Sequence, residues 1–263
     1  MKPNYKNWVP KGLVISVVAG SILFAILFGL SLGTDLFAGV AQRVFQILFG
    51  ILTVVMVLYS TFCINWYVSF SYNGKRRVAA RVIDQVSGYV VLPEGGKGLD
   101  VGCGSAALTI AVAKKNPKAS VVGLDRWGKE YASFNRPLCE NNAKVEGVAE
   151  QVSFVKGDAC KLDFPDESFD AVTSNYCYHN IPSKDRQKII LESLRLVKKG
   201  GTFAIHDLFT QSKYGDMNIL LKTLKDQGYE KVELLDTTDG LFLSKKEATV
   251  LCLSGSKLLV GRK

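Results

Sequence analysis

The chain has 263 residues, of which 48% are hydrophobic, and its formal net charge at neutral pH is +9. No dense run of lysine and arginine with interleaved aromatic residues accompanies this charge, so we do not expect a nucleic-acid partner. The six cysteines contain no Cys-x-x-Cys pair, which argues against a zinc site or a disulfide framework, and no metal is expected.

Two long uncharged stretches open the sequence. They cover residues 12–33 and 44–70, and each exceeds the roughly 20 apolar residues that a helix needs to cross a bilayer. A secretory signal peptide has a shorter apolar core and would not account for the second stretch. We therefore expect a membrane hairpin over residues 1–73 with spans at about 12–33 and 44–66. A single span plus a buried helix is the alternative.

Basic residues flank this hairpin on both sides and are scarce in the loop between its helices. They are Lys2, Lys6 and Lys11 before the first stretch, and Lys75, Arg76, Arg77 and Arg81 after the second. The positive-inside rule then places both termini and the remaining chain in the cytoplasm. We expect an integral membrane protein whose partner is the lipid bilayer. The basic residues also suit anionic headgroups, although a topology signal explains them equally well.

Residues 74–263 alternate between strand and helix patterns, as a doubly wound, mostly parallel α/β sheet requires. Seven strands are predicted, at 98–101, 120–124, 152–155, 168–175, 202–207, 231–236 and 257–261. Helices are predicted at 78–90, 105–115, 129–146, 184–197 and 217–227. The run from Ser244 to Glu247 reads as a capping box that opens a further short helix.

The most informative motif is a glycine turn between the first of these strands and its helix. Gly102 and Gly104 allow the backbone to approach a ligand closely, and Asp100 precedes them by two residues. The next strand ends on Asp125, which is placed to accept hydrogen bonds from a ribose diol. These residues predict a nucleoside-cofactor pocket at the carboxyl edge of a parallel sheet.

The turn alone also satisfies the dinucleotide fingerprint, because Ala107 stands at its last position, so NAD is an alternative. Three features favour another cofactor. A carboxylate at Asp100 suits a ligand with an ammonium and a sulfonium better than a pyrophosphate. Asp158 follows the third strand, where it can accept from an adenine amino group. The fourth strand opens on Asp170 and ends in polar residues.

With these motifs in order, residues 75–263 resemble a class I S-adenosylmethionine-dependent methyltransferase. The resemblance rests on Asp100-x-Gly102-x-Gly104, Asp125, Gly157-Asp158-Ala159, Phe169-Asp170 and Lys199-Gly200-Gly201. It departs from the family at Ala106, where a third glycine is frequent, and in the last motif, which lacks a proline. The cofactor implied is S-adenosyl-L-methionine. The residues implied to bind it are Asp100, Gly102, Cys103, Gly104, Asp125, Arg126, Asp158, Ala159 and Asn175.

Candidates for the acceptor side follow the fourth and fifth strands. His179 and His206 lie at that edge, and a histidine there can accept a proton from an attacking hydroxyl, thiol or amine. Tyr176 and Tyr178 can position a substrate or contact the sulfonium, and packing at the strand end is the plainer alternative. Cys139, Cys160 and Cys177 leave a metalloid acceptor open, as in arsenite methyltransferases.

The expected function is a membrane-anchored methyltransferase that acts on a small or lipophilic acceptor at the cytoplasmic face. Two alternatives belong to other classes. A non-catalytic adenosylmethionine-binding sensor or assembly protein would bind the cofactor without turnover, and an NAD-dependent oxidoreductase would bind a different nucleotide.

Overall fold

The computed structural model of the chain describes residues 2–34, 39–128 and 133–263. The chain divides into two compact units, one formed by Met1–Lys6 with Arg81–Lys263 and the other by Asn7–Ala80. The sequence had suggested that all residues up to 73 form the hairpin. The structure differs, because the first few residues belong to the larger unit.

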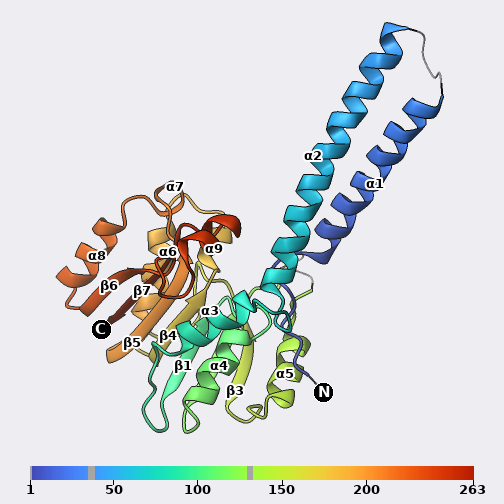
Figure 1. Cartoon of the computed structure of the whole chain (residues 1–263). Coiled ribbons are helices and arrows are strands. Elements are labelled where there is room, and N and C mark those ends of the chain that lie inside the picture. Colours follow the sequence, from blue (N-terminus) through green and yellow to red (C-terminus); the bar gives the residue numbers. More distant parts are fainter. Residues whose placement is uncertain (1, 35–38, 129–132) are drawn as a thin grey trace. The chain divides into compact units, whose positions relative to one another are not determined.

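The smaller unit is a helical hairpin of α1 (Lys11–Gly33) and α2 (Val40–Phe70) (Figure 1). Both helices are long and apolar enough to cross a membrane, and only 11% of the most apolar window of each is buried. Polar side chains pair inside the hairpin, where the Ser21 hydroxyl lies 2.5 Å from that of Ser60. Such internal pairing is what a lipid environment demands of polar groups.

The larger unit is built on a seven-stranded sheet with the order β3-β2-β1-β4-β5-β7-β6. Its strands are β1 (Lys97–Val101), β2 (Ser120–Asp125), β3 (Val152–Lys156), β4 (Phe169–Asn175), β5 (Val197–Leu208), β6 (Glu230–Asp236) and β7 (Ser256–Arg262). The strands from β1 to β5 pair in parallel, and β7 runs antiparallel between β5 and β6. The predicted doubly wound sheet is confirmed.

Helices cover both faces of this sheet, with α3, α4 and α5 on one side and α6 and α8 on the other (Figure 1). Their bounds are α3 (Val78–Ser87), α4 (Ala107–Lys115), α5 (Arg136–Val145), α6 (Arg186–Arg195), α7 (Gln211–Tyr214), α8 (Met217–Asp226) and α9 (Lys245–Val250), and a 3₁₀ turn η2 spans Tyr178–Asn180. The capping box predicted at Ser244 is present, with both of its hydrogen bonds.

Two elements differ from the sequence prediction. Helix α5 begins at Arg136, because Asn135 accepts a hydrogen bond from the Leu138 amide and caps the helix; residues 129–132 lie outside the described part. Strand β5 begins at Val197, five residues earlier than predicted, and includes the Lys199-Gly200-Gly201 motif. Gly200 has φ +80° within this strand.

Candidate active site

The turn after β1 contains two glycines with different roles. Gly102 has φ +75°, and a Cβ there would overlap the Sγ of Cys177. Gly104 has φ +55°, and apart from its chain neighbours no atom of the described residues lies within 4 Å of its Cβ position. The protein's own packing thus requires the first glycine, whereas the described residues leave the space beside the second one open. A ligand can approach the backbone on that open side.

Asp125 joins the end of β2 to this turn. One carboxylate oxygen accepts from the Gly104 amide at 2.8 Å, and the other accepts from the Trp127 amide at 2.7 Å. The Trp127 indole in turn donates to the Gly104 carbonyl at 3.0 Å. Each carboxylate oxygen has a second lone pair, so Asp125 retains acceptor capacity for hydroxyl groups of a ligand.

Asp100 lies beneath the turn and not on its open side. Its side chain is 1% exposed and accepts hydrogen bonds from the hydroxyls of Thr109 at 2.6 Å and Thr173 at 3.3 Å. Burial raises the pKa of Asp100 to about 7, against the opposing effect of the two threonine hydroxyls. A nearby positive charge would favour its ionised form.

The residues after β3 form the far end of the predicted cofactor region. Asp158 is exposed, and its carboxylate accepts from the Cys160 amide at 2.9 Å in a local turn. Ala159 is buried, and Arg126 is exposed after β2. The exposed carboxylate of Asp158 is therefore accessible to a ligand.

Two further predicted cofactor residues are engaged by the protein. Cys103 is buried beside Cys139, whose thiol donates to the Gly104 carbonyl at 3.2 Å. The amide oxygen of Asn175 lies 2.8 Å from Nδ1 of His206. Cys103 is thus buried, whereas Asn175 is half-buried like Asp125.

Hydrogen bonds connect the N-terminal residues Asn4 and Tyr5 to the residues next to the glycine turn. The buried amide of Asn142 accepts from the Asn4 amide at 2.8 Å and donates to the carbonyls of Asn4 and Ser105, each at 3.0 Å. The Ser105 hydroxyl donates to the Tyr5 carbonyl at 2.8 Å, and the Tyr5 hydroxyl donates to Glu146 at 2.9 Å. We call these five residues the N-terminal clamp. It couples the turn to residues that sequence reasoning did not connect with it.

On the acceptor side, His179 and Asp207 form a hydrogen-bonded dyad. Nδ1 of His179 lies 2.5 Å from the Asp207 carboxylate, which is completely buried. The same carboxylate accepts from the backbone amides of Tyr178, His179 and Leu208. These bonds fix the orientation of the imidazole and direct its Nδ1 proton to Asp207, which leaves Nε2 as the basic nitrogen. Among the described residues, Nε2 has no hydrogen-bond partner.

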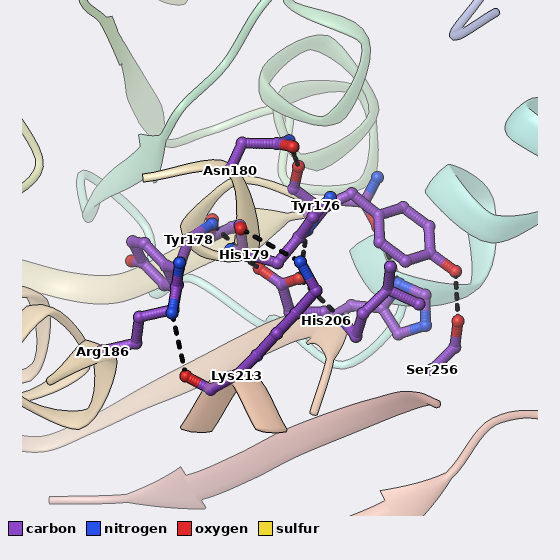
Figure 2. Close-up of polar contacts among 12 residues, drawn as sticks. Tyr176, Tyr178, His179, Asn180, Arg186, His206, Lys213 and Ser256 are labelled. Atoms are coloured by element: carbon purple, nitrogen blue, oxygen red, sulfur yellow. Dashed lines mark hydrogen bonds and ion pairs between the residues drawn. The ribbon is translucent and has the colours of Figure 1, made fainter. Parts of the chain in front are cut away.

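Tyr176 lies between the two histidines, and Figure 2 shows its ring beside both. Its ring centroid is 6.1 Å from that of His179 and 4.7 Å from that of His206. The Tyr176 hydroxyl lies 2.6 Å from the Ser256 hydroxyl, and burial raises its pKa. Tyr176 therefore shapes the wall beside His179.

Two predictions for this side are corrected. Tyr178 is 0% exposed and packs in the hydrophobic core, with its hydroxyl 2.8 Å from that of Ser193, so it does not face an acceptor. His206 is also fully buried, with both ring nitrogens hydrogen-bonded, and burial lowers its pKa to about 3. A histidine held neutral in this way cannot exchange protons with a substrate at neutral pH.

Sequence reasoning missed Asp207, Thr109 and Thr173. Asp207 is the last residue but one of β5, and β5 pairs with β4, so an acid at that position lies beside the loop that carries His179. The pairing of these two strands was the signal that could have identified Asp207. In the described part of the chain, no three His, Cys, Asp or Glu side chains are grouped to hold a metal ion, so Cys139, Cys160 and Cys177 do not form a thiol site.

Solved structures with a similar fold are known. The cyclase SpnF superposes with a TM-score of 0.54 at 21% identity, over 72% of this chain and 82% of its own. Geranyl diphosphate C-methyltransferase from Streptomyces coelicolor gives a TM-score of 0.55 at 11% identity, over 71% and 79%. The strand order and these likenesses establish the fold of the class I S-adenosylmethionine-dependent methyltransferases.

The sequence of the same unit is similar to a methyltransferase family model and to known methyltransferases. Residues 99–205 match the model of the methyltransferase domain family. The sterol 24-C-methyltransferase erg6 of Aspergillus fumigatus is 34% identical over 127 residues, or 48% of this chain and 32% of the relative. The demethylmenaquinone methyltransferase of Bacillus velezensis is 36% identical over 138 residues, or 52% and 53%. The chain thus carries a methyltransferase domain and spans about a third to a half of the length of these relatives.

Proposed function

We propose that this protein is a membrane-anchored enzyme that transfers the methyl group of S-adenosylmethionine to a lipophilic acceptor at the cytoplasmic face. The relatives named for sterols and for demethylmenaquinone support a lipophilic acceptor. The two apolar helices and the basic residues that flank them support the anchor and its orientation.

The residues around the glycine turn fit this cofactor. The space beside Gly104 admits the ligand against the backbone, and Asp125 retains acceptor capacity for the ribose hydroxyls. The exposed carboxylate of Asp158 suits the adenine amino group, and the buried charge of Asp100 favours the cationic methionine end from beneath the turn. When bound, S-adenosylmethionine supplies a methyl group from its sulfonium.

The observation that carries the mechanism is the dyad of His179 and Asp207. We assign Nε2 of His179 as the general base for a hydroxyl or thiol acceptor. Nε2 would take the acceptor proton, and the electron pair left on the acceptor would bond to the methyl group that bound S-adenosylmethionine would supply from its sulfonium, with S-adenosylhomocysteine as the leaving group. Asp207 stabilises the resulting imidazolium, which then releases its proton to water. The dyad lies near the glycine turn, because Cys177, two residues earlier, packs against Gly102.

The test is methyl transfer from labelled S-adenosylmethionine to membrane extract by the wild type, His179→Gln and the neighbouring control Asn180→Ala. We expect the methyl-transfer rate of His179→Gln to be about 10²–10⁴-fold lower than that of the wild type. The remaining rate should no longer depend on pH in the way the wild-type rate does, and cofactor affinity should be unchanged. Asn180 is exposed, and its variant should retain the wild-type rate. Cofactor binding without transfer to any acceptor would instead favour a sensor. An unchanged rate and pH profile in His179→Gln would remove the base from the mechanism.

A further inference from the structure

Two cationic side chains lie beside the dyad without a carboxylate partner. Lys213, in α7, extends its ammonium toward the loop that carries His179 and lies 3.5 Å from the His179 carbonyl (Figure 2). Arg186, the first residue of α6, donates to the Lys213 carbonyl at 3.0 Å. Both side chains are half-buried. Neither forms an ion pair with any residue that the structure describes.

This arrangement contrasts with the other half-buried arginine of α6. Arg195 makes ion pairs with Asp166 at 2.6 Å and with Glu192 at 2.9 Å. A charge that loses part of its hydration without a partner destabilises the folded state, so buried cations are usually paired. The lack of a paired acid at Arg186 and Lys213 therefore requires an explanation.

The polar groups around these cations are also short of hydrogen-bond acceptors. Nε of Arg186 is buried and has no hydrogen-bond partner among the described residues. The hydroxyl of Tyr214, which is 4% exposed, lies near Asp207. Asp207, the acid of the dyad, already accepts four hydrogen bonds, one of them from the imidazole of His179. Donors thus outnumber the acceptors that the protein provides at this site.

We propose that Arg186 and Lys213 form an anion-binding subsite beside His179, which selects acceptors that carry a carboxylate or phosphate group. An ammonium and a planar guanidinium together suit an oxyanion, and charge-assisted hydrogen bonds to it are strong. This inference rests on the proposed function and narrows it, because the lipophilic acceptor then has an acidic group near the atom that receives the methyl.

The experiment measures binding without turnover, using the full-length protein in dodecyl maltoside micelles with saturating S-adenosylhomocysteine. The probes are hexyl phosphate, hexanoate and neutral hexanol, titrated by calorimetry. Wild type should bind an anionic probe at least about tenfold more tightly than hexanol, with an affinity that falls as salt is added. Lys213→Gln and Arg186→Gln should each weaken that binding about tenfold, and Lys213→Arg should restore most of it. Lys188→Gln, an exposed neutralisation in the same helix, is the matched control.

Each outcome decides the proposal. Unchanged affinity for S-adenosylhomocysteine shows that a variant is folded, and the salt dependence of the wild type requires no variant. Equal binding of hexyl phosphate, hexanoate and hexanol by the wild type, or unchanged anion binding in both glutamine variants, would overturn the subsite. A protein that methylates neutral lipids but does not prefer anions would refute the subsite alone. Selective anion binding without methyl transfer to any acceptor would refute only the proposed function.

Discussion

Asp100 is the residue whose ionisation most directly links folding to cofactor binding. Its pKa in the folded protein is about 7, above the ordinary value of an aspartate, because it is buried. The folded protein therefore keeps a proton that the unfolded chain releases between pH of about 4 and 7. Without cofactor, the contribution of Asp100 to stability must fall as pH rises through this window, by up to about 4 kcal/mol.

The variant Asp100→Asn tests whether the contribution of Asp100 to stability falls as pH rises. Denaturant unfolding of the cofactor-free wild type and variant should show a stability difference that changes between pH 5 and pH 7.5, in favour of the variant at the higher pH. The same variant should bind S-adenosylmethionine more weakly at pH 7.5, because the favourable charge beneath the glycine turn is gone. A stability difference that is independent of pH would show that Asp100 has an ordinary pKa.

Among the elements, the N-terminal clamp is the one that local sequence patterns do not reveal. Asn142 is 0% exposed, and its amide makes three hydrogen bonds, to both backbone groups of Asn4 and to the Ser105 carbonyl. An asparagine in a predicted amphipathic helix indicates a solvated position. Only the folded chain brings Asn4 to it across 138 residues of sequence separation.

Asn142→Ala removes the amide and leaves those backbone groups unsatisfied, at a cost of about 1–3 kcal/mol. We expect lower thermal stability of the larger unit and weaker cofactor binding, since Ser105 follows Gly104 directly. Asn141→Ala is the matched control, because Asn141 is the exposed neighbour in the same helix. Equal cofactor affinities in the two variants would show that the clamp does not position the turn.

The difference between local sequence features and contacts made only in the folded chain explains which parts of the site could be predicted. Glycine turns and strand-end acids are local features, so Gly104 and Asp125 could be predicted as candidates from the sequence, and the structure places them together, with a hydrogen bond of 2.8 Å. Tyr178 was misjudged because its neighbours in sequence face the sheet edge, whereas its own side chain enters the core within the 3₁₀ turn η2. Asp207 was overlooked because its role depends on the pairing of β4 with β5, which the sequence does not display.

At the scale of the whole molecule, we expect the larger unit to fold without the hairpin. The central hydrophobic cluster runs from Leu99 to Leu259 and contains no residue of α1 or α2. A chain that starts at Asn73 should therefore fold and unfold cooperatively in circular dichroism. It should bind S-adenosylmethionine several-fold more weakly than the full-length protein, because Asn4 and Tyr5 are missing. Failure to fold would show that the first 72 residues contribute to the core, and full affinity would show that the clamp is dispensable.

The clamp also has a consequence for how the protein is made. Asn4 and Tyr5 are synthesised before both apolar helices, whereas their partners Ser105, Asn142 and Glu146 are synthesised after them. The two ends of the hairpin belong to one folded unit, so they must remain on the same side of any bilayer that the helices cross. A hairpin inserted with a single crossing would leave Asn4 on the opposite side of the bilayer, and the Asn142 amide would lose its two hydrogen bonds with Asn4. Formation of the N-terminal clamp therefore requires that both helices have crossed the bilayer.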